Sequence, residues 1–387
     1  WPSMIICWLK PRRPFIALYW CLHHVVWTRS RAPMAQEQVP SLKWLIFGCG
    51  GVGGYFGARI AKVQGQSVSF MVRNQALAAL KEHGVRIQSI CGDLTVPPSE
   101  LGPILDTGAL DNGERFQADV IMLGCKAWEA EKCLKMCEPW CGPDTIVLPL
   151  QNGVEGLSTI KEIVSGWGKG HALAGCCNIV SAIKEPGFIK HWAADPPYIT
   201  FGEFEGAPRA ATRQAKAVFD AAVGMEGHLE DDVLSKIWEK FAFITSTTAV
   251  QATTGPHATQ DVIPQVPELY ATWRAAMIEV ITLCRSYGIN YDDASLENRV
   301  GMLKAAVGAT TSCSRDLWSG RPSEVDDLLG SVVRLGKEQQ VPTPTIAACY
   351  GALILRDRIA RGDSSVPVKP PAEGQKILGP GWAETSA

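Results

Sequence analysis

The sequence carries almost no net charge and has none of the usual metal-binding motifs. Its 37 basic and 39 acidic residues leave a formal charge of −2 at pH 7, which argues against a nucleic-acid or membrane partner held by bulk charge. There is no C-x-x-C pair. Cys133, Cys137 and Cys141 recur every four residues and would line one face of a continuing helix, but no histidine cluster accompanies them, so no metal site is expected. Its 13 cysteines, several in apolar segments, indicate reduced thiols and a reducing compartment.

The sequence also has no internal repeat and no apolar run long enough to span a bilayer. Residues 1–33 contain five basic residues and no acidic one. Such an N-terminus is typical of a mitochondrial targeting segment. The alternative, which we favour, is that translation starts at Met34, because MAQEQVPSLKW leads directly into the first expected strand. We therefore set residues 1–40 apart as an N-terminal extension and predict a cytoplasmic location, or a mitochondrial one if residues 1–33 are a targeting segment.

Residues 44–57, WLIFGCGGVGGYFG, place a short apolar strand, a G-x-G-x-x-G turn and a helical segment in succession. In a dinucleotide-binding turn, the first glycine permits the tight turn, the second lets a pyrophosphate approach, and the third lets helix and strand pack closely. The first N–H groups of the helix then receive the phosphates. We predict that the turn binds a dinucleotide through Gly48, Cys49, Gly50, Gly51, Val52 and Gly53.

Arg73 stands at the end of the next expected strand, residues 67–72. NAD-preferring sites usually place an acid there, which accepts hydrogen bonds from the ribose 2′-OH. The guanidinium of Arg73 instead offers donors that match a 2′-phosphate. NADP(H) is therefore the predicted cofactor. The alternative is an exposed arginine at a strand end without a ligand.

The segments that follow alternate between strand and helix patterns up to about residue 170. We expect a helix over 75–83, a strand pair over 85–97, a strand over 118–125, a helix over 127–137 and a strand over 145–148. This order predicts a doubly wound parallel sheet, whose ligands bind beyond the carboxyl ends of the strands. Lys126 and Asn152 both fall at that edge. From 171 to 204 we expect antiparallel strands that complete a Rossmann-type domain over residues 41–206.

Residues 207–361 are expected to form an all-helical domain. The predicted helices cover 209–223, 232–253, 267–287, 295–307, 324–340 and 345–360, with breaks at glycine and proline. Residues 362–387 are rich in proline and glycine and are predicted to be a flexible tail.

Lys240 interrupts an apolar helical stripe formed by Val233, Ile237 and Ile244. One interpretation is that its aliphatic stem covers apolar surface while the ammonium group reaches water. The other is a partly desolvated lysine with a lowered pKa that donates a proton near neutral pH. We favour the second because a nicotinamide domain is expected in the same chain. Hydride delivery to a carbonyl creates an alkoxide, and Lys240 would supply its proton.

Two further polar residues have both a structural and a functional interpretation. Glu324, after Ser323, opens an expected helix, where an acid favours the helix dipole; it could also pair with Lys240 or bind a substrate hydroxyl. Ser312 is either a helix N-cap or a substrate hydrogen-bond donor. His257 is expected in a loop and His191 on a strand surface.

Six segments of the chain stand out together: GCGGVGGYFGARI at 48–60, CKAWE at 125–129, LPLQNGVEG at 148–156, WEKFAFITS at 238–246, TSCSRDLWSGRPSEVD at 311–326 and VPTP at 341–344. In this order, they resemble the ketopantoate reductase (2-dehydropantoate 2-reductase) family. The resemblance implies a Rossmann-type N-domain, a helical C-domain like that of 6-phosphogluconate dehydrogenase, and an active site in the cleft between them. It also implies NADPH-dependent reduction of a 2-oxo acid, ketopantoate to pantoate, for pantothenate and coenzyme A synthesis.

By the same resemblance, Lys240 matches the catalytic lysine and Glu324 the glutamate that completes the site and its cofactor contacts. Asn152 matches the asparagine near nicotinamide and substrate. Lys126 matches a lysine of the cofactor cleft, Arg73 the 2′-phosphate arginine and Ser312 a substrate-binding serine. A homodimer is a further expectation.

Ile244 and Thr248 depart from the family pattern, because well-studied members carry substrate-holding asparagines at these two positions. Losing buried amide partners removes interactions of about 1–3 kcal/mol each. Two alternatives to ketopantoate held by asparagines at these positions therefore stay open. One is a different 2-oxo acid. The other is ketopantoate held by Thr247, Thr248 or Ser312. A third alternative, from another functional class, is a sensor that binds NADPH without turnover.

Overall fold

The computed structural model describes residues 39–110 and 115–366. Nearly all of the predicted N-terminal extension (1–40) and most of the predicted tail (362–387) lie outside the described residues. Within the described ranges, no helix is long and apolar enough to cross a membrane. Across those same ranges, no three His, Cys, Asp or Glu side chains gather in a way that could hold a metal ion.

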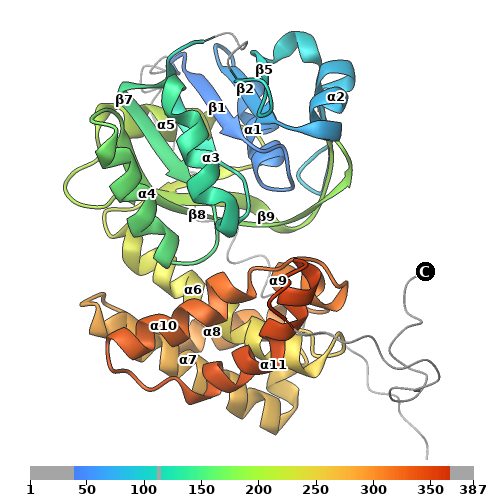
Figure 1. Ribbon diagram of the computed structural model, residues 1–387, viewed down its shortest axis with the longest axis vertical. Helices are drawn as coiled ribbons and strands as arrows, with labels where there is room; N and C mark the ends of the chain where they lie inside the picture. Colours follow the sequence, from blue (N-terminus) through green and yellow to red (C-terminus); the bar gives the residue numbers. More distant parts are fainter. Residues whose placement is uncertain (1–38, 111–114, 367–387) are drawn as a thin grey trace, which may run out of the picture. The chain divides into compact units, whose positions relative to one another are not determined.

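The first part of the described chain builds a ten-stranded sheet with a parallel centre (Figure 1). In spatial order, the parallel strands are β5 (Ile104–Asp106), β2 (Ser67–Val72), β1 (Lys43–Phe47), β6 (Ala118–Leu123), β7 (Cys141–Pro149) and β8 (His171–Glu185). β8 pairs antiparallel with β9 (Phe188–Glu203), as predicted. Beyond β9 lie β3 (Val85–Ser89) and β4 (Leu94–Val96), and β10 (Glu226–Leu229) also pairs with β9.

Successive residues of the central strands enter two different cores, because side chains alternate across a sheet. Trp44 and Ile46 of β1 belong to the core that includes α1 (Gly53–Ala61) and α5 (Ala210–Ala221). Leu45 and Phe47 belong to the core that includes α3 (Ala130–Cys137) and α4 (Glu155–Gly166). Helices therefore cover both faces, and the predicted doubly wound α/β fold is confirmed.

The second part of the described chain is helical, as predicted. Its elements are α6 (Val233–Thr254), α7 (Pro267–Ser286), α8 (Asp293–Ala305), α9 (Ser312–Trp318), a short π-helix (Asp326–Gly330), α10 (Ser331–Glu338) and α11 (Pro344–Ala360). α6 packs against α7, α9 and α11 and is buried along most of its length. Most residues of α6 therefore contribute to the core of this region.

Helix α3 ends at Cys137, as predicted, and Cys141 begins β7. The helix does not continue, so Cys133, Cys137 and Cys141 do not line one helix face; Pro139, which has no N–H, lies between Cys137 and Cys141. One local prediction was wrong. His191 is not on the surface but 2% exposed, and its ring nitrogens contact Ser89 Oγ at 2.8 Å and Ala193 O at 2.7 Å. Glu324 directly precedes the helical residues, one position before the predicted start at 324.

Candidate active site

The turn after β1 lies where the carboxyl ends of three parallel strands meet. The N–H of Gly48 donates to the carbonyl oxygen of Met71 in β2, and the N–H of Gly124, just after β6, donates to that of Phe47, both at 2.9 Å. Since β1 pairs with both β2 and β6, the segments that follow the three strands share one edge of the sheet. Open α/β sheets bind their ligands at this edge.

The glycines of the turn meet different requirements. Gly48 has a φ of +89°, which favours glycine. A Cβ on Gly53 would lie 2.3 Å from the carbonyl oxygen of Gly48, so close packing of α1 requires glycine there. A Cβ on Gly50 would meet only Ile183 Cδ1, at 4.0 Å. Packing therefore does not require glycine at position 50, and the open space there would let a pyrophosphate approach the backbone.

Helix α1 begins at Gly53 with no side-chain cap and no acid in its first turn. Backbone N–H groups and the helix dipole favour an anion at such a start. The turn and α1 therefore fit a dinucleotide, and their backbone would hold its pyrophosphate.

Arg73 lies beyond the end of β2, in an extended conformation, as the residue before α2 (Asn74–His83). Its side chain is 61% exposed, and Nη2 lies 2.9 Å from Oε1 of Glu129. Glu129 belongs to a short 3-10 helix, Ala127–Glu129, that follows β6. An acid thus stands beside Arg73, although it comes from a different strand connection.

Lys126 extends from the connection after β6 towards two carboxylates of the helical region. Its Nζ lies 3.1 Å from Asp316 Oδ2 and 3.5 Å from Glu324 Oε2. Burial lowers the pKa of Lys126, but the carboxylates of Glu324 and Asp316 outweigh that effect and raise the pKa above its ordinary value. Lys126 therefore stays cationic at neutral pH, which suits an anion-binding or orienting role better than proton donation.

Asn152, in the loop after β7, joins Lys240 to Glu324. Its Oδ1 accepts a hydrogen bond from Lys240 Nζ at 2.8 Å, and its Nδ2 donates to Glu324 Oε2 at 3.3 Å. An ammonium group only donates and a carboxylate only accepts, so these partners determine the orientation of the amide. Lys240 is half-buried on α6, and its ammonium group is directed to the edge of the sheet that carries the glycine turn.

Glu324 is 3% exposed, and the residue before it is firmly anchored. Ser323 donates from its N–H and its hydroxyl to Asp357 Oδ1, at 2.7 and 3.0 Å. Arg361 binds the other oxygen of Asp357 at 2.6 Å and donates to the carbonyl oxygen of Ser323 at 2.5 Å. The end of α11 thereby holds the backbone that presents Glu324.

The two remaining predicted substrate residues differ in accessibility. Ser312 is exposed on the first turn of α9, and the N-cap is Thr311, whose hydroxyl accepts from Ser314 N at 3.2 Å. The N-cap interpretation of Ser312 was therefore wrong. Thr248 is fully buried, and its hydroxyl donates to Thr311 Oγ1 at 3.0 Å. In this geometry, Thr248 supports the start of α9.

Comparison with protein families accounts for both halves of the fold. Residues 44–206 match the family model for ketopantoate reductase PanE/ApbA, and residues 232–356 match the model for the ketopantoate reductase PanE/ApbA C terminal. The chain belongs to the ketopantoate reductase PanE/ApbA family. The family is one of nicotinamide-dependent oxidoreductases, and the predicted family resemblance is thereby confirmed.

Individual relatives of the ketopantoate reductase family are distant. The uncharacterized oxidoreductase YkpB of Bacillus subtilis is 28% identical over 320 residues, which is 81% of this chain and 98% of that protein. The 2-dehydropantoate 2-reductase of Mesorhizobium japonicum is 26% identical over 339 residues, 83% of this chain and 99% of that protein. A solved D-mandelate dehydrogenase, in ternary complex with NADH and anilino(oxo)acetate, has a TM-score of 0.70 at 19% identity and covers 83% of this chain and 99% of its own. Proteins named for different substrates thus share this fold.

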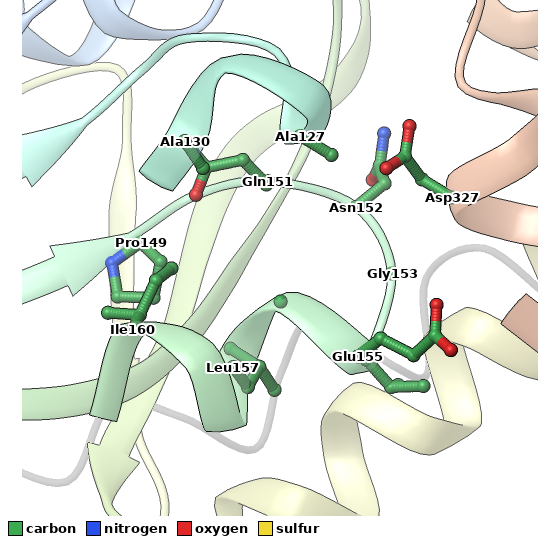
Figure 2. Close-up of a pocket in the computed structure, with 12 residues that line it drawn as sticks. Ala127, Ala130, Pro149, Gln151, Asn152, Gly153, Glu155, Leu157, Ile160 and Asp327 are labelled. Carbon is green, nitrogen blue, oxygen red and sulfur yellow. The ribbon is translucent and has the colours of Figure 1, made fainter. Parts of the chain in front are cut away.

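A cavity of about 50 Å³ borders Asn152 (Figure 2). Gln151, Asn152 and Glu155 line it from the loop after β7 and the start of α4, and Asp327 reaches it from the helical region. Desolvation by burial, with the neighbouring carboxylates of Glu324 and Asp326, raises the pKa of Asp327 to about 6. The cavity is far smaller than ligand pockets of roughly 300–1,000 Å³, so it could enclose only a small part of a ligand.

Three charged residues near the ketopantoate reductase motifs were not singled out from the sequence. They are Glu129, Asp316 and Asp327. Asp316, which contacts Lys126, is 190 positions away from it in sequence, so no local spacing indicates the pair. Glu129 and Asp316 lie inside two of the motifs that carried the resemblance, and this was the available signal.

Proposed function

We propose that the protein reduces a 2-oxo acid to a 2-hydroxy acid with NADPH, and that ketopantoate is its preferred substrate. The observation that carries the proposal is the hydrogen-bonded set Lys240–Asn152–Glu324 at the same sheet edge as the glycine turn. We also propose the division into a cofactor domain, 41–206, and a catalytic domain, 207–361. The expected homodimer stays a prediction.

A bound reduced nicotinamide would supply the hydride that converts the substrate carbonyl to an alkoxide. Lys240 then donates a proton to the alkoxide oxygen and recovers one from solvent. Asn152 accepts a hydrogen bond from the Lys240 ammonium group and so orients it towards the reacting oxygen. Glu324 holds the Asn152 amide from its other end. Proton transfer from a positioned group typically contributes about 10²- to 10⁴-fold in rate.

For cofactor binding, we assign the pyrophosphate to the turn Gly48, Cys49, Gly50, Gly51, Val52 and Gly53, and the 2′-phosphate to Arg73. Lys126, Asn152 and Glu324 would contact the nicotinamide half. For the substrate, we assign direct contacts to Asn152 and Ser312. Thr248, predicted as a substrate contact, would act through Thr311 because its hydroxyl is engaged there.

The test follows oxidation of NADPH by the purified full-length chain with ketopantoate and a panel of other 2-oxo acids. Lys240→Ala should lower kcat/KM by about 10²-fold or more. Lys236→Ala is the matched control, because this exposed lysine lies one turn earlier on α6 and pairs with Glu239 at 3.3 Å. Unchanged turnover in Lys240→Ala would refute the assigned chemistry. NADPH binding without turnover of any 2-oxo acid would favour the sensor.

A second candidate is a reductase for a different 2-oxo acid. Ile244 is half-buried and apolar, and Thr248 donates its hydroxyl to Thr311, so neither offers an amide to ketopantoate. The D-mandelate dehydrogenase of the same fold was solved with an oxo acid that carries an anilino group. In the same panel, the highest kcat/KM for an aromatic 2-oxo acid would select this candidate.

A further inference from the structure

Two oppositely charged side chains flank the glycine turn from the two strands that neighbour β1. Arg73 follows β2 and Glu129 follows β6, and β1 lies between these strands. Although 56 positions separate them in sequence, Arg73 Nη2 and Glu129 Oε1 are 2.9 Å apart. The pair spans the edge of the sheet at which the turn would bind a dinucleotide.

The end of β2 is where dinucleotide-binding folds read the adenosine ribose. An acid there accepts hydrogen bonds from the free 2′-OH of NAD, whereas an arginine accommodates the 2′-phosphate of NADP. In this protein, Arg73 occupies the usual position, and Glu129 reaches it from the connection that follows β6. Both kinds of ribose-binding group are therefore present in one site.

The backbone that carries Glu129 is held on several sides. The N–H of Glu129 donates to the carbonyl oxygen of Lys126 at 3.0 Å. The guanidinium of Arg361 stacks over the ring of Trp128 at 4.1 Å, and Ala130, the next residue after Glu129, is 6% exposed. The Glu129 side chain is 33% exposed, so it is accessible to a ligand while its backbone stays in place.

We propose that Glu129 is a cofactor-specificity residue that weakens the preference for NADPH and admits NADH; the inference rests on the nicotinamide binding assigned above. A 2′-phosphate carries about −1.5 to −2 charges at pH 7. To bind Arg73, the 2′-phosphate must displace the Glu129 carboxylate from the guanidinium, and the two negative groups then remain close to each other. The free 2′-OH of NADH has no such conflict, because it donates a hydrogen bond to Glu129.

The test measures binding of NADPH and of NADH separately, by titration of the purified full-length chain without any 2-oxo acid. Glu129→Gln removes the negative charge and retains the shape. It should raise the ratio of NADPH to NADH affinity by about tenfold, or about 1.4 kcal/mol, through tighter NADPH and weaker NADH binding. Glu131→Gln is the matched control, because it makes the same charge change at an exposed glutamate that pairs with Lys135 instead; its ratio should equal that of the unmodified chain.

Two outcomes would overturn the proposal. Weaker NADPH binding by Glu129→Gln would mean that Glu129 holds Arg73 ready for the 2′-phosphate. An unchanged ratio would mean that the pair does not contact the ribose. Failure of the unmodified chain to bind either cofactor would refute nicotinamide binding itself, and this result is distinct from a changed or unchanged ratio. Because no substrate is present, an error in the assigned 2-oxo acid leaves the test intact.

Discussion

The side-chain oxygen of Asn152 accepts a hydrogen bond from Lys240 Nζ at 2.8 Å. The two residues lie 88 positions apart, one after a strand of the parallel sheet and the other on the central helix of the helical region. Their contact joins the cofactor-binding fold to the proposed proton donor. The ammonium group of Lys240 therefore has a defined hydrogen-bond partner in the candidate site.

We expect Asn152→Ala to lower kcat by about 10- to 100-fold, because Lys240 loses the acceptor that orients its proton. The free energy of unfolding should change little, since the side chain is half-buried in a loop. Steady-state kinetics and chemical unfolding of the same preparation provide the two readings. A normal kcat would show that the Asn152–Lys240 contact does not serve the reaction.

Alanine substitutions at two glycines of the turn should separate folding from cofactor binding. Gly53→Ala places a Cβ 2.3 Å from the Gly48 carbonyl oxygen, and overpacking of this kind costs about 1–3 kcal/mol or more. In Gly50→Ala, the new Cβ would meet no atom nearer than Ile183 Cδ1, at 4.0 Å, so the free energy of unfolding should be retained. Its NADPH affinity should nevertheless fall by roughly tenfold, because the methyl group occupies the approach to the backbone.

Thermal unfolding and cofactor titration of both glycine variants provide the measurements. If Gly50→Ala bound NADPH as tightly as the unmodified chain, the pyrophosphate would not lie at Gly50. A stable Gly53→Ala variant would contradict the close packing of α1 on the turn.

Substitutions of Asp357 should affect the reaction although this residue does not border the cavity. Asp357 is 1% exposed and accepts both hydrogen bonds donated by Ser323. Asp357→Ala leaves these donors unpaired and should lower the free energy of unfolding by about 2–4 kcal/mol. Asp357→Asn keeps one acceptor oxygen and should lose less stability.

Both Asp357 variants should also lower kcat, because Ser323 directly precedes Glu324. Chemical unfolding and steady-state kinetics would measure the two effects. If Asp357→Asn lowered the free energy of unfolding as much as Asp357→Ala does, the assigned acceptor role would be contradicted.

Stability should depend on the ionisation of Asp327 between about pH 4 and pH 6. Its pKa is raised from 3.8 to about 6 in the folded protein, so the folded state binds more protons than the unfolded state in this range. The free energy of unfolding therefore falls as pH rises through it. Two pKa units correspond to roughly 2.7 kcal/mol, and solvent screening of this half-buried group reduces the effect below that value.

Asp327→Asn should remove this contribution and raise stability at pH 7 relative to the unmodified chain. Chemical unfolding at pH 4.5 and at pH 7.5 would measure the difference, because these two buffers lie on either side of the Asp327 pKa of about 6. Asp144→Asn, which changes the same charge on an exposed strand residue, is the matched control. An identical pH dependence in Asp327→Asn and the unmodified chain would contradict the raised pKa.

Much of the fold follows from local sequence patterns. The strand at 67–72 was predicted with its observed bounds, and the helices α5, α6, α7 and α11 within about two residues at each end, because apolar periodicity and glycine or proline breaks are local signals. The short elements β5, β10 and α9 were missed, since a segment of three to seven residues carries too little periodicity. His191 was misplaced because burial of a single histidine depends on Ser89, about 100 positions away in sequence.

The candidate site divides in the same way. The glycine turn, and the positions of Arg73, Lys126 and Asn152 after parallel strands, were readable from the chain because a parallel sheet brings strand ends to one edge. The hydrogen-bond or ion-pair partner of each side chain could not be predicted from the sequence. Glu129 beside Arg73, Asp316 beside Lys126 and Asn152 between Lys240 and Glu324 join segments 56 to 190 residues apart. Such pairs depend on how helices and loops pack in three dimensions, and packing is set by the whole core at once rather than by spacing along the chain.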